Sequence, residues 1–189
     1  ATAAGFMAVE TGWGFTINRY ASEEVREKFV KPAIQGDKFI GIATTEPGGG
    51  SDVAGFESTA EKDGDEWVLN GEKTFISGIE ECQQMGGGYW VNVRTGPKIE
   101  EAPHKNMTAF FVPIDADGLE PQEPYDDAGR GSLSTSGFIM EDVRVPEEYM
   151  LGEQGKGFYH TMEGFDLARI LIGASSVGVT RRVLEEAAD

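Results

Sequence analysis

The segment from Thr45 to Asp52 carries the residues of this sequence whose types and spacing best suit the binding of a phosphate group. It reads Thr-Glu-Pro-Gly-Gly-Gly-Ser-Asp, and consecutive glycines let a backbone approach a ligand closely and adopt positive φ. Exposed backbone N–H groups and the Ser51 hydroxyl could then hold the phosphate. Composition alone also fits a flexible hairpin loop. A Walker loop is excluded because no Gly-Lys-Ser/Thr follows, and no helix opens here as a dinucleotide fingerprint requires.

A second segment, Gly71 to Gly78, could place an aromatic ring beside a hydroxyl group. Phe75 and Ser77 are two residues apart on a predicted strand, so their side chains leave the same face. A flat isoalloxazine ring needs an aromatic or apolar surface at one face and a hydroxyl near its N5 edge. The alternative is that Phe75 is an ordinary core residue, as most aromatic residues on strands are.

A third pair, Asp166 and Arg169, lies three residues apart on a predicted helix, where the two side chains can touch. The pair is either a salt bridge on the helix surface or a clamp for a charged ligand that faces a pocket. The sequence pattern alone leaves both interpretations open.

The elements that must position these residues read as helical, then β-rich, then helical. Residues 1–20 indicate helical pieces broken at glycines, and a helix is predicted from Ser22, a good N-cap, to Gly36-Asp37. Its apolar stripe contains Val25, Phe29 and Ala33. A long amphipathic helix is predicted after Gly157, because apolar residues recur there at steps of three and four.

From about Lys38 the apolar period changes to two, which is typical of strands. The predicted strands are residues 39–45, 57–62, 66–69, 73–77, 89–95, 107–113 and 135–145. Asp63-Gly64-Asp65 indicates a hairpin turn. Short strands separated by Gly, Pro and Asp turns favour an antiparallel barrel or sandwich, and the lack of helices between them argues against a Rossmann sheet. The predicted fold class is α+β.

Composition excludes several classes of function. The net charge is −17, from 33 acidic and 16 basic residues, which argues against nucleic-acid binding. No stretch approaches the ~20 consecutive apolar residues of a membrane span. One cysteine, Cys82, allows no internal disulfide, and no Cys/His spacing indicates a metal site. His104 and His160 read as surface or packing residues. The start lacks a signal-peptide pattern, and both ends read as cut.

Taken in order, five motifs closely resemble the acyl-CoA dehydrogenase family. The motifs are Thr45-Glu-Pro-Gly-Gly-Gly-Ser-Asp-Val-Ala-Gly55, Leu69-Asn-Gly-Glu-Lys-Thr-Phe-Ile-Ser77, Phe138-Ile-Met-Glu-Asp-Val-Arg-Val-Pro146, Gly155-Lys-Gly-Phe158 and Phe165-Asp-Leu-Ala-Arg169. No single motif is decisive, but their order and spacing run through the whole chain.

The resemblance implies a division into three parts. Residues 1–37 would be the end of an N-terminal helical domain, and residues 38–152 an antiparallel β-barrel middle domain. Residues 153–189 would be the first helix of a C-terminal four-helix bundle. The expected fold is therefore α+β, a β-barrel flanked by helical segments, with roughly half of the usual protein absent.

The resemblance also implies FAD as cofactor, with the following residues binding it: Ile42, Thr44, Thr45, Gly50, Ser51, Phe75, Ile76 and Ser77. Thr44 and Thr45 would bond the O2, N3 or N1 region of the flavin. Phe75, at a position often held by Trp, would pack against the ring, and Ser77, often Thr, would approach N5.

The substrate implied by the resemblance is an acyl-CoA thioester, bound by Ser51, Asp166 and Arg169. Ser51 would reach the FAD pyrophosphate and lie near the pantetheine arm, while Asp166 and Arg169 would contact the CoA portion. The catalytic glutamate of most relatives lies beyond this chain. A minority carry it at the position of Ala168, and Glu163 reads as a solvated helix acid. We therefore expect no catalytic residue and no metal within this chain.

The implied reaction is α,β-dehydrogenation to the trans-2-enoyl-CoA, with electrons passed to an electron-transfer flavoprotein. A homotetramer or dimer is expected of the full-length protein, in a bacterial or archaeal cytoplasm or, in a eukaryote, in the mitochondrial matrix. Two alternatives stay open. One is an acyl-CoA oxidase or flavin monooxygenase on the same scaffold. The other is a β-barrel module that binds a partner without catalysis.

Overall fold

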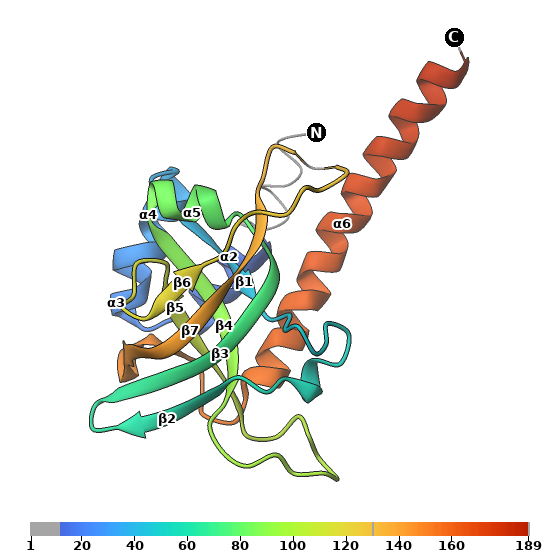
Figure 1. The fold of residues 1–189 in the computed structure, drawn as a ribbon. Coiled ribbons are helices and arrows are strands. Elements are labelled where there is room, and N and C mark those ends of the chain that lie inside the picture. The colour runs from blue at the N-terminus through green and yellow to red at the C-terminus, as the bar shows by residue number, and fades with distance from the viewer. Residues whose placement is uncertain (1–11, 130, 189) are drawn as a thin grey trace.

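The computed structural model describes residues 12–129 and 131–188, in which one twisted sheet lies between short helices and one long helix (Figure 1). The helical segments are α2 (Gly12–Tyr20), α3 (Glu23–Val25), the π-helical η2 (Arg26–Val30), α4 (Lys31–Gln35), η3 (Val53–Gly55), α5 (Ile79–Met85), η4 (Glu147–Tyr149) and α6 (Gly157–Ala188). The strands are β1 (Phe39–Ala43), β2 (Thr59–Asp63), β3 (Glu66–Ser77), β4 (Gly87–Arg94), β5 (Met107–Pro113), β6 (Leu119–Pro121), β7 (Thr135–Pro146) and β8 (Met150–Leu151).

Among the described residues the sheet has eight strands, and its order is β6-β7-β3-β2-β4-β5-β8, with β1 beside β4. The predicted hairpin is present, since β2 and β3 pair antiparallel around a turn at Gly64, whose φ is +64°. The predicted strands 66–69 and 73–77 are one continuous strand, β3, which pairs with β7 along its length. Most neighbouring strands are antiparallel, which confirms the α+β class.

The predicted barrel is not closed. The strands at the two ends of the path, β6 and β8, have three and two residues and do not pair with each other. In addition, β1 runs parallel to β4, and β2 meets β4 in parallel at a single position. Closure needs a continuous ladder around the sheet, and such short end strands leave it open.

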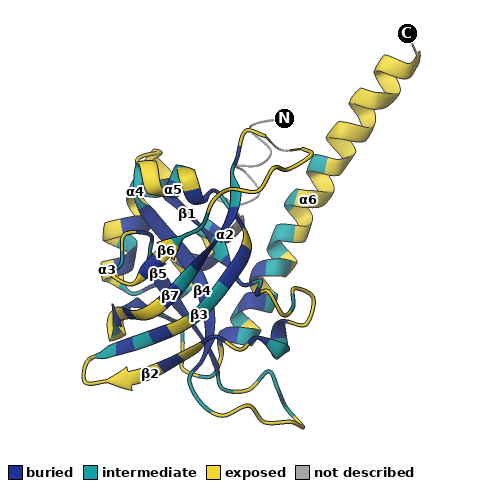
Figure 2. Cartoon of the chain, viewed as in Figure 1, coloured by how far each residue is buried: buried dark blue, intermediate teal, exposed yellow. Residues whose placement is uncertain are grey.

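The core is formed where the sheet meets the short N-terminal helices. Every residue of β4 is buried, and so are the large side chains of Trp67, Phe110, Phe111 and Phe138. Figure 2 shows this buried centre with exposed residues on the outer turns and on the far half of α6. A smaller cluster of Val53, Phe56 and Met107 packs beneath the start of α6. Burying this apolar surface is the main force that holds the sheet in place.

The first helices confirm one prediction and correct another. Ser22 caps α3 by accepting a hydrogen bond from the Val25 backbone N–H at 3.3 Å, and Gly36 ends α4 in the left-handed conformation. However, α2 runs through Gly14 without a break, because its neighbour Trp13 is buried in the core. The predicted helical pieces at 1–11 lie outside the described residues.

The long helix α6 is packed only along its first turns. Gly157 and Gly164 allow close contact, since a Cβ at Gly164 would lie 2.6 Å from the Trp13 ring. Beyond them, Ile170, Val177 and Leu184 are 65–70% exposed, and Figure 1 shows this half projecting past the sheet. Within residues 12–129 and 131–188, no helix is long and apolar enough to cross a membrane.

Candidate functional site

The end of β1 lies beside the middle of β3, and this places two of the predicted site segments together. β1 is held in register with β4, Phe39 opposite Gly87 and Ala43 opposite Val91. Just past β1, the Thr45 carbonyl accepts a hydrogen bond from the Thr74 backbone N–H at 2.9 Å. Thr44 is buried and Thr45 is half-buried. The two threonines predicted to meet a flavin therefore border the strand that carries Phe75.

Phe75 lies at an irregularity in β3 that turns its ring toward solvent. The ladder to β7 shifts register between Lys73 and Ile76, and Phe75 has φ +55°, a rare conformation for a bulky residue. Its side chain is 67% exposed, while Ile76 is buried. The interpretation of Phe75 as a core residue is therefore wrong. The exposed ring contacts Tyr125 at 5.2 Å between centroids.

The remaining polar groups of this strand also face outward or are held by neighbours. Ser77 is half-buried and follows the buried Ile76. The Thr74 hydroxyl is 2.7 Å from the Tyr125 hydroxyl. Tyr125 thereby anchors the segment that bears the exposed ring, and the sequence pattern gave no sign of it, because it lies in a loop far along the chain.

The loop from Glu46 to Ser58, which we call the glycine loop after Gly48, Gly49 and Gly50, is held by hydrogen bonds at both ends. The backbones of Glu46 and Gly49 exchange hydrogen bonds of 3.0 and 3.1 Å, and Gly50 lies against the Thr45 side chain. At the far end, the Glu46 carboxylate accepts hydrogen bonds from the backbone N–H groups of Glu57 at 2.6 Å and Ser58 at 3.1 Å. The Ser51 side chain is left exposed between these anchors.

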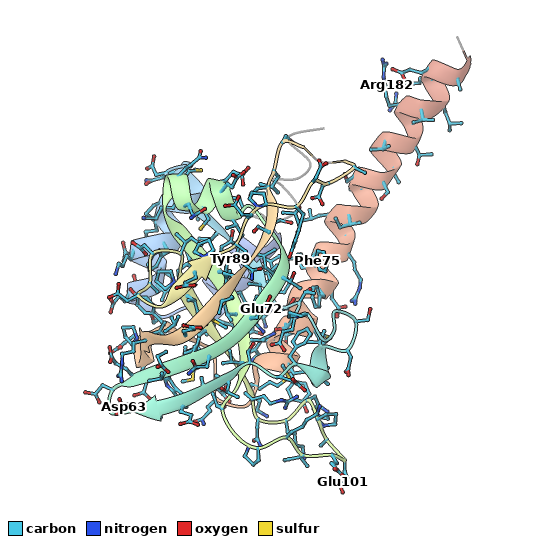
Figure 3. The ribbon with its side chains drawn as sticks, viewed as in Figure 1. Asp63, Glu72, Phe75, Tyr89, Glu101 and Arg182 are labelled. Carbon is cyan, nitrogen blue, oxygen red and sulfur yellow. The ribbon has the colours of Figure 1, made fainter. Side chains whose placement is uncertain are left out.

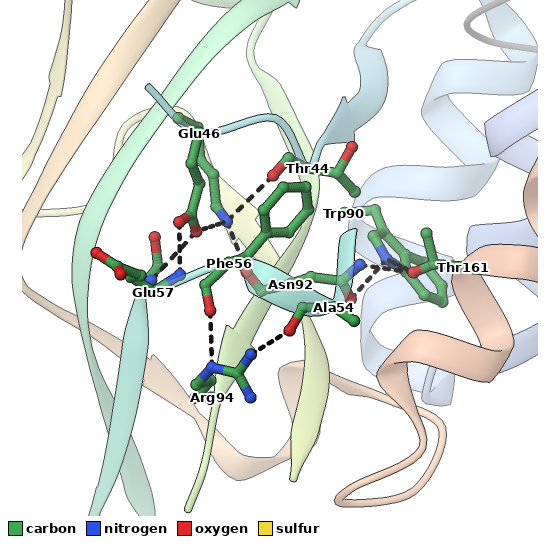
Figure 4. A network of polar contacts seen from close by, with 11 residues as sticks. Thr44, Glu46, Ala54, Phe56, Glu57, Trp90, Asn92, Arg94 and Thr161 are labelled. Atoms are coloured by element: carbon green, nitrogen blue, oxygen red, sulfur yellow. Dashed lines mark hydrogen bonds and ion pairs between the residues drawn. The ribbon is translucent and has the colours of Figure 1, made fainter. Parts of the chain in front are cut away.

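Beneath this loop lies a buried ion pair that the sequence analysis missed (Figure 4). Lys73 is fully buried, and its ammonium donates to Glu46 at 2.6 Å, to the Asn92 carbonyl at 2.7 Å and to the Thr44 carbonyl at 3.4 Å. Its Nζ also lies 5.0 Å from the centre of the Phe56 ring. The sequence alone could not indicate this pair, because Glu46 and Lys73 are 27 residues apart and meet only in the folded sheet.

Burial acts on both members of the pair. It lowers the pKa of Lys73 to about 8, although the Glu46 charge opposes this. Burial raises the pKa of Glu46, but the Lys73 charge and the hydrogen bonds from Glu57, Lys73 and Ser58 outweigh it and leave that pKa below its usual range. Both groups are therefore charged at neutral pH.

Glu46→Gln should reduce the amount by which the free energy of unfolding falls as the pH is lowered. Because the folded-state pKa of Glu46 lies below the unfolded value of 4.5, its stabilising contribution is present above that pH and is lost as pH falls through the folded-state pKa. Glutamine cannot take up this proton. Urea unfolding between about pH 7 and about pH 3 would measure the difference, with Glu147→Gln as a control at an exposed pair. An E46Q profile parallel to that of the wild type would contradict the assignment.

A second buried cation holds the outer side of the loop. Arg94 donates through Nε to the Phe56 carbonyl at 2.7 Å, through Nη2 to the Ala54 carbonyl and through Nη1 to the Pro103 carbonyl at 3.0 Å. These contacts join the glycine loop to the long irregular loop at residues 95–106. Arg94 is thus occupied by backbone carbonyls rather than free for a ligand phosphate.

The network also reaches α6. The Asn92 side chain donates to the Thr161 hydroxyl at 2.6 Å, and the Trp90 indole donates to the same hydroxyl at 3.1 Å. Thr161 is fully buried. Since the Asn92 carbonyl accepts from Lys73, one chain of hydrogen bonds joins the end of β1 to the helix that carries the predicted substrate residues.

Asp166 and Arg169 form the predicted ion pair on the exposed face of α6. Asp166 also borders a hollow of ≈ 310 Å³ between α2 and α6. Nearby, the exposed Glu163 carboxylate accepts a hydrogen bond from Tyr20 at 2.5 Å and lies 3.7 Å from Arg19, so this solvated acid also ties α6 to α2. Figure 3 places Phe75 on β3 and Arg182 far along α6, beyond the body of the protein.

A second hollow, of ≈ 370 Å³, lies against the glycine loop. Gly48, Gly49 and Gly71 line it together with the carboxylates of Asp52 and Glu57. Carboxylates repel a phosphate group, and Ser51 does not line this hollow. If Ser51 binds a phosphate as predicted, it would do so on the exposed side of the loop, away from this hollow.

The residues present fit a flavin, the cofactor that the sequence resemblance implies. An exposed aromatic ring at Phe75 offers a flat apolar surface, Thr45 and Ser77 are half-buried, and Ser51 is exposed, so their hydroxyls can accept or donate hydrogen bonds. By contrast, in the part of the chain that the structure describes, no three His, Cys, Asp or Glu side chains gather as metal ligands do. The individual flavin contacts stay predictions.

Comparison with protein families and curated proteins gives one consistent result. Residues 41–143 match the family described as acyl-CoA dehydrogenase, middle domain. The caffeyl-CoA reductase–Etf complex subunit CarC of Acetobacterium woodii is 37% identical over 88% of this chain and 42% of its own length. The mitochondrial short-chain specific acyl-CoA dehydrogenase of Rattus norvegicus is 33% identical over 89% of this chain and 39% of its own length. The chain thus spans about two fifths of these relatives.

Solved structures agree with this comparison. Butyryl-CoA dehydrogenase from Megasphaera elsdenii matches 98% of this chain and 48% of its own, with a TM-score of 0.86 and 29% sequence identity. The complex of glutaryl-coenzyme A dehydrogenase with glutaryl-CoA matches 99% of this chain and 46% of its own, with a TM-score of 0.88 and 28% identity. The open sheet and its flanking helices are therefore a known arrangement.

Proposed function

The chain belongs to the acyl-CoA dehydrogenase family, and on this premise we propose that the complete protein that carries it uses FAD to oxidise an acyl-CoA thioester between its α and β carbons. The observation that carries the proposal is the exposed Phe75 ring, held by an irregular turn of β3 next to Thr45 and the glycine loop. An exposed aromatic ring beside hydrogen-bonding groups suits the face and edge of a flavin.

When bound, the flavin would accept the hydride that leaves the β-carbon of the substrate, and with it both electrons of the oxidation, while the α-proton would go to a base. The residues of this chain would bind and orient. We propose that Phe75 packs on the flavin ring, that Thr44, Thr45 and Ser77 bond its polar edge, and that Ser51 bonds its pyrophosphate. Ile42, Gly50 and Ile76 complete the proposed lining.

On the substrate side, we propose that Asp166 and Arg169 contact the CoA portion. Arg169 is exposed, and among the described residues its ion pair is with one neighbouring exposed carboxylate, so it can turn to a phosphate at little cost. Removal of the α-proton needs a base within hydrogen-bond reach. Ala168 stands where a minority of the family carries it, so we assign the base to a part of the protein outside this chain.

The electron acceptor that we propose is an electron-transfer flavoprotein. This rests on the relatives, one of which is named as a subunit of an Etf complex. We keep the division into residues 1–37, 38–152 and 153–189, the homo-oligomeric state and the compartment, bacterial or archaeal cytoplasm or mitochondrial matrix, as parts of the same proposal.

The complete protein is expected to bind FAD and to lose its flavin colour when it meets its acyl-CoA. The measurement is the visible spectrum of the purified protein, followed by anaerobic addition of a panel of acyl-CoAs. Bleaching of the ~450 nm band, a property of the flavin itself, would name the substrate class. A yellow protein that no acyl-CoA bleaches would contradict the dehydrogenase. A reduced protein that oxygen reoxidises rapidly would point to the oxidase.

A pair of variants on one helix sharpens this test. Arg169→Met should raise the acyl-CoA concentration for half-bleaching about tenfold to a hundredfold, because hydrogen bonds to a charged group are worth about 1.5–3 kcal/mol. Arg182→Met is the matched control, since Arg182 makes a similar exposed ion pair, with Glu186, farther along α6. Equal effects of both variants would contradict a specific contact of Arg169.

A further inference from the structure

The buried Glu46–Lys73 pair touches both segments that border the proposed flavin site. Lys73 lies two residues before Phe75, and its ammonium holds the Thr44 carbonyl at the end of β1. Glu46 follows Thr45 directly, and its carboxylate holds the backbone N–H groups at the far end of the glycine loop. The pair therefore lies at the junction of three backbone segments, and its charged atoms reach all of them.

The geometry leaves little freedom to these charged groups. The three hydrogen bonds of the Lys73 ammonium end on the Glu46 carboxylate, on the Thr44 carbonyl just past β1 and on the Asn92 carbonyl of β4, and the side chain is fully buried. Glu46 is 8% exposed and bonds through both oxygens. A shift of either side chain would break contacts on at least two segments, so the pair fixes their relative positions.

Stability alone gives a weak reason for such a pair. Removing two charges from water is costly, and apolar residues of similar volume often replace a buried ion pair without loss of stability. What apolar side chains cannot replace is the set of directional hydrogen bonds to the Thr44 carbonyl and to the N–H groups of Glu57 and Ser58. Placement of the loop is therefore what distinguishes this pair from a packed apolar contact.

We propose that Glu46 and Lys73 are positioning residues of the flavin site, which clamp the glycine loop and the end of β1 against the β3 segment that carries Phe75. The proposal rests on the proposed use of FAD, and it adds two residues that would not touch the cofactor. The pair acts through the backbone of Thr44 and of the loop.

The test compares FAD binding and loop protection in variants of the complete protein. In Glu46→Met/Lys73→Met, both charges and all their hydrogen bonds are lost, while the volume is roughly kept. The FAD dissociation constant should rise at least about tenfold, which corresponds to ~1.4 kcal/mol. In the ligand-free protein, amide hydrogen exchange at Glu57 and Ser58 should accelerate, because these N–H groups lose their acceptor.

Two further variants separate placement from general damage. Glu46→Gln/Lys73→Met restores an acceptor for the loop N–H groups without the charge, and should recover part of the FAD affinity. Lys62→Met/Glu147→Met removes an exposed Lys–Glu pair of nearly the same length, 2.7 Å, and should leave both measurements unchanged. If E46M/K73M does not fold, E46Q/K73M is the test variant. It lacks the hydrogen bond from Lys73 to the Thr44 carbonyl, so its FAD affinity should be lower than that of the wild type.

A folded E46M/K73M protein with wild-type FAD affinity and wild-type exchange at Glu57 and Ser58 would overturn the proposal. So would wild-type affinity in E46Q/K73M when the first variant is unfolded. A wild-type protein that binds no FAD would contradict the proposed function instead. In that case the exchange measurement alone decides whether the pair clamps the loop.

Discussion

Lys73→Met is expected to lower the free energy of unfolding by about 3–5 kcal/mol, because it leaves the carboxylate of Glu46 buried without its counter-ion. Lys73 is fully buried and Glu46 is 8% exposed, so water cannot replace the lost partner. The measurement is urea unfolding at about pH 7, below the Lys73 pKa of about 8, where the lysine of the wild type carries its charge.

A double-mutant cycle with Glu46→Met tests whether the loss of stability in K73M comes from the unpaired charge of Glu46. If the loss in K73M comes from an unpaired buried charge, E46M/K73M should be more stable than K73M alone, in spite of carrying one more substitution. Lys62→Met, at an exposed pair with Glu147, should change stability by no more than ~1 kcal/mol. A loss of that small size in K73M would show that the buried pair is weakly coupled.

Gly87→Ala is expected to cost more than about 3 kcal/mol, because the position allows no side chain. Gly87 has φ +126°, and a Cβ there would lie 1.8 Å from the Phe39 carbonyl oxygen. That carbonyl belongs to β1, whose register with β4 begins at this pair. The substitution would therefore push β1 away from β4 and displace Thr44 and Thr45 at its end.

Thermal or urea unfolding of G87A would measure this loss. Gly48→Ala is the matched control, because a Cβ there meets no atom within 4 Å and the backbone is not in the left-handed region. That variant should stay within ~1 kcal/mol of the wild type. If G87A were as stable as G48A, the close approach of β1 to β4 would not be the feature that sets the position of β1.

The local elements of this fold could be predicted from the sequence because their signals are local. Ser22 and Gly36 bound a helix through their own capping contacts, and the Gly64 turn produces the hairpin of β2 and β3. The long helix after Gly157 likewise follows from its apolar spacing. The three-residue β6 and the seven-residue α5 were missed, since neither is long enough to show a period.

The candidate site was predictable only where its residues stand in contiguous motifs. Phe75, Ser77 and the glycine loop could be named from such motifs, and the helix pair of Asp166 and Arg169 is present. The exposure of Phe75 could not be predicted, because it depends on a register shift against β7. The partners Lys73 and Glu46 meet only after β1 and β3 lie side by side, and barrel closure likewise depended on strand ends that are far apart in the sequence.

The ladder between β3 and β7 has a consequence for how the chain folds. It pairs Glu66 with Pro146 and Ser77 with Thr135, so it has a high contact order, and contacts of this kind form slowly. During synthesis, β3 emerges from the ribosome long before β7 does and keeps one hydrogen-bonding edge unpaired in the meantime. Unpaired edges promote association between chains. Until β7 has been synthesised, the edge of β3 that it will cover is therefore open to association with other chains.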